Sequence, residues 1–253
     1  RHIDASTWYT NATRTAVWVV ATTMVTLITI TGSASRNALL SIVGRITGRV
    51  VVDRATVFNV YVGDKRQTCW AHLLRYFEGM AQQRDVPTSK IGLALCNLTL
   101  AMFSLWHEVK NGAMTHDEFR AAMREPRGQP DHQIFIERVR VVLQQGVLCG
   151  HRPTQGTCRD ILEKHWDALW TFVDIKDVEP TNNHAEQELR SMVQWRRTSF
   201  GTQSERGNRF AERITTASRT LRKRREPLQP FLYESVQAHW VGALKPALVP
   251  EAA

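Results

Sequence analysis

Three acidic residues in this sequence, Asp4, Asp53 and Glu186, are the candidates for metal-assisted chemistry. Asp53 follows Val50–Val52, a β-branched run typical of a strand buried on both faces. A carboxylate at the end of such a strand is costly to bury unless it has a partner such as a metal ion. Two divalent metal ions about 3.5–4 Å apart take carboxylate ligands from several elements, because one activates the attacking oxygen and the other stabilises the leaving oxygen. Two facing carboxylates alone would repel each other, so a third acid is needed, and Glu186 is the candidate.

Two of these acids, Asp4 and Glu186, also have an ordinary structural interpretation. An aspartate such as Asp4 at the end of a strand is often a turn or cap residue. Glu186 has Arg190 four residues later, which is the spacing of an ion pair on a helix surface. The residues alone therefore nominate the three acids and leave their role open.

The N-terminal part of the sequence predicts a mixture of strands and one helix. Strands are expected over 1–4, 16–22, 24–31, 49–53 and 67–71, and a helix over 34–43. Mixed strands followed by helices, with acids at strand ends, suggest a ribonuclease-H-like core. In such a core the first and fourth strands lie side by side, so Asp4 would face Asp53.

From Leu73 onwards the apolar residues follow helical spacing and predict an all-α block. Polar stretches with Pro and Gly divide this block at 84–89, 124–131 and 150–156. The tryptophans of the block are interpreted as core residues, with stacking on a flipped base as the alternative. They are Trp106, Trp166 and Trp170.

Two further helices are expected after this block. Thr181 or Asn182 is the expected N-cap of a helix over 183–195, and Pro227 ends a second helix over 208–225. A zinc site is the alternative for a group of cysteine and histidine side chains, but their spacing lacks the close cysteine pair of structural zinc sites. The group is Cys149, His151, Cys158 and His165.

Composition narrows the class of protein. With 253 residues, 43% of them hydrophobic, the chain can bury a core, which excludes disorder of the whole chain. Its four cysteines are too few for a disulfide framework and are read as reduced thiols of a cytosolic protein. The uncharged stretch 15–35 is broken by threonines and predicts paired strands, so no membrane partner is expected. No signal peptide precedes the first strand, and we expect the chain to be the downstream part of a longer protein.

Positive charge is concentrated near the C-terminus. The formal net charge is +9, and between Arg190 and Arg225 eleven basic residues stand against two acidic ones. A concentrated patch of this kind neutralises several phosphates at once, whereas the alternative is a solvated helix face. The candidates for contacts with the DNA backbone are Arg190, Arg196, Arg197, Arg206, Arg209 and Arg213.

Three sequence blocks resemble a known family. The string Asn182-Asn183-His184-Ala185-Glu186, followed by Leu189-Arg190 and by WRRTSFGT over 195–202, resembles the third-acid region of the DDE transposases of the insertion-sequence-sixty-six family. The segments VVDR over 51–54 and NVY over 59–61 resemble the region of its second acid. CWAHLLRYF over 69–77 resembles the strand-to-helix segment that follows. The resemblance extends from residue 1 to about residue 235, and the third-acid block is its most specific part.

The resemblance implies an α/β fold, a ribonuclease-H-like mixed sheet with an all-α insertion between the last strand and the helix bearing the third acid. The first part of the core would span 1–83, the insertion 84–180, the C-terminal helices with the basic stripe 181–240, and a tail 241–253. Asp4, Asp53 and Glu186 would bind two Mg²⁺ (or Mn²⁺) ions for DNA cleavage and strand transfer at transposon ends.

The same resemblance implies the partners. They are transposon ends and target DNA, on which the protein would assemble as a homo-oligomer in the bacterial cytoplasm, associated with the nucleoid.

His72 and Arg75 lie one helical turn apart and are possible accessory residues facing the phosphodiester. Asn183, like Asn182, is either a helix cap or an amide that orients a ligand oxygen.

The sequence departs from the family at Ala5. The family usually continues the first aspartate with an acid and a threonine, whereas Ala5 and Ser6 follow Asp4 here. Loss of that carboxylate favours an alternative, a transposase-derived DNA-binding protein without catalysis. A second alternative keeps the fold and the metal ions but cuts DNA without joining it.

Overall fold

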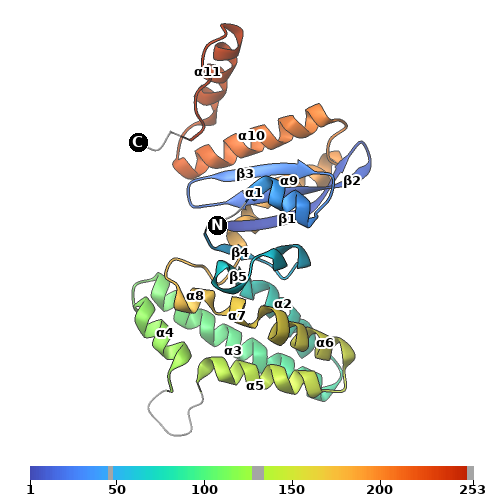
Figure 1. Cartoon of the computed structure of the whole chain (residues 1–253), viewed down its shortest axis with the longest axis vertical. Coiled ribbons are helices and arrows are strands. Elements are labelled where there is room, and N and C mark those ends of the chain that lie inside the picture. Colours follow the sequence, from blue (N-terminus) through green and yellow to red (C-terminus); the bar gives the residue numbers. More distant parts are fainter. Residues whose placement is uncertain (45–47, 127–133, 250–253) are drawn as a thin grey trace. The chain divides into compact units, whose positions relative to one another are not determined.

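The computed structural model describes residues 1–44, 48–126 and 134–249 (Figure 1). The chain divides into two compact units. One, here called the sheet unit, comprises Arg1–Val50, Ala55–Val60 and Asn182–Ala253. The other, the helical unit, comprises Val51–Arg54 and Tyr61–Thr181. The two ends of the chain therefore build one unit, and its middle builds the other.

β1 (His2–Thr10) and β2 (Thr13–Ala21) form an antiparallel hairpin in the sheet unit. Asn11 and Ala12 make its turn with positive φ values, as in two-residue type I′ hairpins. The strand predicted over 1–4 is too short, because the polar residues after Asp4 pair with β2 along its whole length. Asp4 consequently lies inside β1 and not at its end.

β3 (Thr26–Thr31) pairs antiparallel with β2, and the order of the strands is β3-β2-β1-β4-β5. β4 (Val50–Val52) is divided between the two units, and its three valines are buried, as the sequence predicted. A mixed α/β fold with a five-stranded sheet is thereby confirmed.

β5 (Arg66–Thr68) and α2 (Trp70–Ala81) follow each other in the helical unit. The strand predicted over 67–71 is wrong in its second half, because α2 already begins at Trp70. The indole of Trp70 is buried, with its ring centroid 5.1 Å from that of Trp170. The backbone N–H of Trp70 donates to the carbonyl of Pro180 (2.9 Å). Tertiary packing here overrides the β preference of an aromatic residue.

The core of the sheet unit lies between one face of the sheet and two helices, α9 (Asn183–Ser199) and α10 (Glu205–Arg224). Both helices exceed the predicted bounds, since α9 continues past Trp195 and α10 begins before Asn208. The buried members of this core are Trp8, Val17, Val19, Ala21, Ile28, Ala185, Leu189, Met192 and Ala211. α1 (Arg36–Val43), η1 (Thr56–Val60) and α11 (Leu228–Trp240) also belong to the sheet unit.

The helical unit contains the predicted all-α block. Its elements after α2 are η2 (Gly63–Lys65, before β5), α3 (Val86–Lys110), α4 (His116–Arg124), α5 (Phe135–Leu148), α6 (Arg152–Asp160), the π-helical turn η3 (Ile161–His165), α7 (Trp166–Leu169) and α8 (Thr171–Asp174). Trp106 and Trp170 are buried in its hydrophobic core and Trp166 packs against that core, which confirms that the three are core residues.

The predicted breaks in this block are only partly right. Asp85 caps α3 with its side chain, so the first break is shorter than 84–89. α6 runs through Gly156, because Arg152 already begins that helix. α4 ends at Arg124 as expected, and 127–133 lie outside the described residues, as do 250–253 of the predicted tail.

α3 is long and apolar enough to cross a bilayer, judged by length and composition alone. Ile91, Leu95 and Met102 on this helix are nevertheless buried in the hydrophobic core of the helical unit. We therefore interpret α3 as the central core helix of that unit.

Candidate functional site

Asp4 lies on the face of the sheet that α9 covers. Strand alternation puts Asp4 on the same side of β1 as Trp8, which is buried in the core shared with α9. Its cross-strand neighbour Val19 belongs to the same core. Ala5 instead pairs with Trp18, whose ring packs on η1. The Asp4 side chain is half-buried, and its Oδ1 accepts a hydrogen bond from the N–H of Ala5 (2.8 Å).

The start of α9 is fixed to β1 by Asn182. Its side chain is fully buried, and Nδ2 donates to the backbone carbonyl of Ile3 (2.8 Å), the residue before Asp4. Its Oδ1 lies 3.3 Å from Nδ1 of His2. Glu186 lies in the first turn of α9 and is half-buried. The structure thus brings the turn that carries Glu186 to the segment of β1 that carries Asp4.

Asn182 occupies the predicted N-cap position of α9, but its side chain makes no capping hydrogen bond. Asn183 is the first residue of the helix and is exposed. The link from Asn182 to β1 could not be found in the sequence, because an asparagine before a helix predicts a cap whatever lies nearby.

Asp53 follows β4 in the helical unit, next to the segment that leads into α2. The N–H of Cys69, the residue before α2, donates to the carbonyl of Val52 (2.8 Å). The candidate accessory residues His72, half-buried, and Arg75, exposed, lie in the first half of α2. The helical unit therefore places the end of the strand before Asp53 beside the start of the helix that carries His72.

The neighbour of Asp53, Arg54, is anchored at the end of α6. Its Nη1 lies 3.3 Å from Oδ2 of Asp160, and its guanidinium stacks 4.4 Å from the ring centroid of Tyr76. Burial opposes ionisation of Asp160, but the hydrogen bond from Lys164 and nearby positive charges lower the pKa of its carboxyl below the usual value. The ionised carboxylate holds Arg54, and with it the chain next to Asp53.

A second buried cation lies beside this anchor. Arg66 is almost fully buried, and its Nη2 donates to the carbonyl of Lys164 (2.9 Å) and lies 3.2 Å from Nδ1 of His165. Burial, reinforced by the charge of Arg66, lowers the pKa of His165 to about 4. His165 is therefore neutral at pH 7, and its π-helical turn is tied to β5.

The zinc interpretation of Cys149, His151, Cys158 and His165 finds no support. Within 1–44, 48–126 and 134–249 these side chains do not form a group with metal-binding distances. Burial, with the nearby Cys149, raises the pKa of the Cys158 thiol to about 12. The thiol of Cys149 instead contacts the carbonyl of His151 (3.8 Å).

The basic stripe divides into exposed and engaged side chains. The exposed members named above as DNA contacts are Arg190, Arg197, Arg206, Arg209 and Arg213. Arg196 differs, because its Nη1 donates to Oγ of Ser6 (3.0 Å) and to the carbonyl of Thr7, so it ties α9 to β1. Formal charge alone gave no means of separating Arg196 from its neighbours.

One side of α10 is hydrogen-bonded to the outer edge of β3. Three side chains at four-residue spacing accept bonds from alternate N–H groups of the strand. The pairs are Glu212 with Ile30 (2.5 Å), Thr216 with Ile28 (3.0 Å) and Thr220 with Thr26 (3.1 Å). Four helix residues rise about 6.0 Å and two strand residues about 6.7 Å, so the two repeats match over this length. We call these three side chains the edge ladder.

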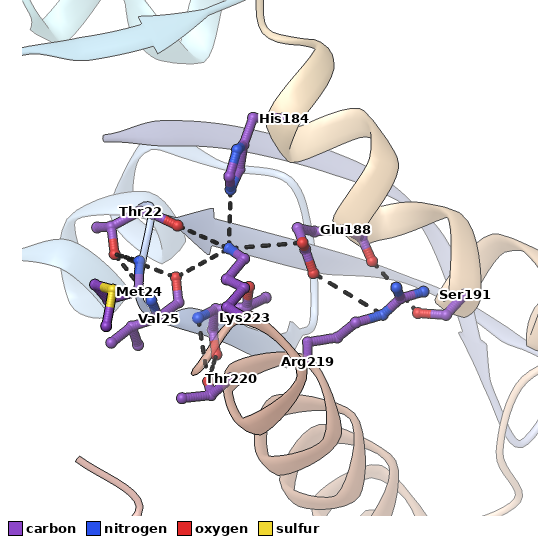
Figure 2. A network of polar contacts seen from close by, with 10 residues as sticks. Thr22, Met24, Val25, His184, Glu188, Ser191, Arg219, Thr220 and Lys223 are labelled. Carbon is purple, nitrogen blue, oxygen red and sulfur yellow. Dashed lines mark hydrogen bonds and ion pairs between the residues drawn. The ribbon is translucent and has the colours of Figure 1, made fainter. Parts of the chain in front are cut away.

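Lys223 continues this contact at the C-terminal end of α10 (Figure 2). Its Nζ donates to the carbonyls of Thr22 (2.8 Å) and Val25 (3.3 Å). The same nitrogen lies 2.9 Å from Nε2 of His184 and 3.6 Å from Oε1 of Glu188, both on α9. Burial lowers the pKa of Lys223, although Glu188 opposes that shift. Lys223 thus joins α10, α9 and the turn between β2 and β3.

Comparison with known proteins gives one match. The family model described as "Transposase IS66 family" matches residues 2–210 of the chain. The matched region contains Asp4, Asp53 and Glu186. Searches of curated proteins and of solved structures found no match.

Proposed function

This chain belongs to the IS66 family of transposases, and we propose that it carries the catalytic part of a DNA transposase whose metal ligands are Asp4, Asp53 and Glu186. The proposed reaction is cleavage of phosphodiesters at transposon ends, followed by strand transfer into target DNA. The proposed setting is the bacterial nucleoid, with the protein assembled as a homo-oligomer on DNA.

The observation that best supports this proposal is the buried amide of Asn182. It connects the residue before Asp4 to the residue before α9, so two of the three acids are carried by segments that are bonded to each other. A surface glutamate that only pairs with Arg190 would need no such connection. The strand order β3-β2-β1-β4-β5, followed by helices, further supports a ribonuclease-H-like core.

The chemistry of the donor set fits Mg²⁺ or Mn²⁺. These hard cations prefer oxygen ligands, and the three side chains offer carboxylate oxygens from half-buried positions. Bound ions would activate the attacking oxygen and stabilise the leaving oxygen. The chain itself supplies the fixed backbone of β1 and α9, the anchored Arg54 next to Asp53, and exposed arginines for the DNA backbone.

Ala5 does not remove a side chain from the face on which Asp4 lies. Because successive residues of a strand point to opposite faces, an acid at position 5 would project toward Trp18 and η1. The departure from the family pattern therefore leaves the proposed triad intact. It still favours the inactive DNA-binding protein as the second candidate, since an acid is missing next to Asp4.

The test compares the parent chain with Glu186→Gln and Asp53→Asn in the presence of Mn²⁺. Nicking of supercoiled plasmid and joining of a 3′-hydroxyl end are assayed together, and Mn²⁺ binding is measured by titration calorimetry. We expect either substitution to reduce nicking by about 1,000-fold and to weaken metal binding. The exposed Glu234→Gln on α11 is the matched control and should behave as the parent.

Three outcomes separate the candidates. Nicking with joining supports the transposase, and nicking without joining supports the nuclease. DNA binding with no metal binding and no nicking, unchanged by Glu186→Gln, supports the inactive protein. In that last case Ala5→Glu is the next variant, because restored nicking would assign the loss to position 5.

A further inference from the structure

The loop between α9 and α10 presents the aromatic ring of Phe200 to solvent. Phe200 is 77% exposed and ends α9 in the left-handed region, with φ 57° and ψ 25°. That backbone conformation is disfavoured for a bulky side chain, and exposure of a large apolar ring is unfavourable as well. A strained backbone and an exposed ring at one residue are a reason to look for a functional role there.

The backbone around Phe200 is held in place by the end of β1. Gly201 has a φ of 95°, and a Cβ there would lie 2.1 Å from the carbonyl oxygen of Tyr9. The N–H of Thr202 donates to that same carbonyl (3.0 Å), and the carbonyl of Thr202 accepts from the N–H of Asn11 (2.8 Å). The loop is therefore fixed to the sheet, and it holds the ring outward.

A second exposed ring lies on the adjoining helix. Phe210 of α10 is 62% exposed and packs edge-on against Trp195, with ring centroids 6.5 Å apart. Trp195 in turn packs against the buried Trp8, with centroids 6.4 Å apart. Phe210 is thus the outer end of an aromatic row anchored in the core of the sheet unit.

Exposed cations accompany these two rings. Arg197 lies in the last turn of α9, and Arg206, Arg209 and Arg213 follow on the first half of α10. Of the two acids in α10, Glu212 accepts from the N–H of Ile30 and is directed to β3, and Glu205, the exposed first residue of the helix, accepts from the side-chain amide of Asn208 (3.4 Å). Both rings are therefore exposed on segments that carry more exposed basic side chains than acidic ones.

We propose that Phe200 and Phe210 form a stacking platform for unpaired DNA bases, with Arg197, Arg206 and Arg209 contacting the adjacent phosphates. Exposed aromatic rings between positive side chains are the usual means of binding single strands, because every base has a face for stacking. The bases of an intact duplex are stacked on each other and offer no such face. The inference rests on the proposed function, in which the protein acts on cleaved DNA ends, whose terminal base pairs open more readily than pairs inside a duplex.

The test measures binding to two DNA probes in EDTA, so that no metal-dependent step contributes. One probe is a 20-nucleotide oligo(dT) with a single 2-aminopurine, and the other is a duplex of the same length. Anisotropy gives the affinity for each probe, and quenching of 2-aminopurine fluorescence reports stacking on a protein ring.

The decisive variant is Phe200→Gly, because glycine relieves the positive φ as it removes the ring. We expect it to fold at least as stably as the parent, while its affinity for the single strand falls about 5- to 30-fold and the quenching is lost. Affinity for the duplex should stay within about two-fold, since the phosphate contacts remain. Phe210→Ala should show a similar loss, and the exposed Leu148→Ala in the helical unit is the control.

Two results would overturn the proposal. Unchanged single-strand affinity and quenching in both phenylalanine variants would exclude a stacking platform. A change in sedimentation behaviour of Phe200→Gly without a change in DNA binding would assign the ring to a protein interface. A chain without nicking activity that retains both the single-strand preference and the quenching would keep the platform while the catalytic proposal failed.

Discussion

The two halves of α10 carry similar numbers of positive side chains but use them differently. In the first half, Arg206, Arg209 and Arg213 are exposed. In the second half Arg222 is exposed, but Arg219 lies 3.9 Å from the carboxylate of Glu188, and Lys223 binds two backbone carbonyls and lies beside that same carboxylate. A cation that already has partners stabilises the fold, whereas an exposed one is available to a ligand.

The difference arises from the packing of the helix. The edge ladder and Lys223 turn one side of α10 toward β3 and α9, and the positive side chains on that side are enclosed. The first half extends past the start of the ladder, where Phe210 and its neighbouring arginines face solvent. The basic stripe of the sequence therefore overstates how many positive side chains are available to a ligand such as DNA.

The largest expected effect is that of Lys223→Met, which removes the cation bound in the second half of α10. Removal of the ammonium leaves Glu188 and two carbonyls without their shared partner in a mostly buried position, which should cost about 2–4 kcal/mol of unfolding free energy. Urea denaturation measures this loss. The neighbouring, exposed Arg222→Met should change stability by less than about 0.5 kcal/mol, and equal losses in the two variants would erase the distinction.

The exposed half is tested by replacing Arg206, Arg209 and Arg213 together with alanine. If each contacts one phosphate, the slope of log affinity against log salt should become shallower by about 2.7, and duplex binding near 0.1 M salt should weaken by about 100-fold. Anisotropy titrations over a salt series measure both quantities. Stability should hardly change, so a large drop in the urea midpoint would show that these arginines are structural.

In the helical unit, the pH dependence of stability distinguishes a buried side chain that has partners from an exposed one. His165 is neutral in the folded protein because its pKa is lowered to about 4, whereas the unfolded chain takes up a proton near pH 6.5. The unfolded state therefore binds more protons below pH 6.5, and stability should fall toward pH 5 by about 1–2 kcal/mol. His165→Gln should flatten that part of the curve, while the exposed His239→Gln should not. Parallel curves for His165→Gln and the parent would contradict the burial of an uncharged imidazole beside Arg66.

The smallest expected effect concerns a single rung of the edge ladder. Thr216→Val keeps the shape of the side chain but leaves the N–H of Ile28 without its acceptor, at a cost of about 1 kcal/mol. Thermal and urea unfolding should both detect it, together with faster hydrogen exchange at Ile28. Thr198→Val is the matched control, at an exposed position near the end of α9 where the hydroxyl donates to carbonyls of the same helix.

Much of the fold was predictable because local patterns and tertiary structure agree there. The valines of β4 form a buried strand, and the helical spacing after Leu73 belongs to real helices. The prediction failed where the secondary structure of a segment depends on contacts with residues far away in the sequence. The polar segment after Asp4 is a strand because it pairs with β2. Trp70 begins a helix because its ring packs against Trp170 and its N–H donates to the carbonyl of Pro180.

The sequence nominates the residues of the candidate site, which stay a prediction, but it does not indicate which contacts hold the segments that carry them. The motif around Glu186 nominates an acid, yet nothing in it indicates that Asn182 binds the carbonyl of Ile3. Likewise, the sequence next to Asp53 does not indicate that Arg54 is held by Asp160, more than one hundred residues later. These supports depend on three-dimensional neighbours, which periodicity and spacing do not encode.

The edge ladder also bears on solubility. β3 ends the sheet, and an uncovered end strand offers a row of N–H groups on which another chain can add its own strand. With Glu212, Thr216 and Thr220 bonded to those groups, this edge of the sheet is closed to such growth for as long as α10 stays docked. The helix that carries the exposed arginines therefore also protects this edge against aggregation, and variants that loosen the helix should precipitate before they lose their positive surface.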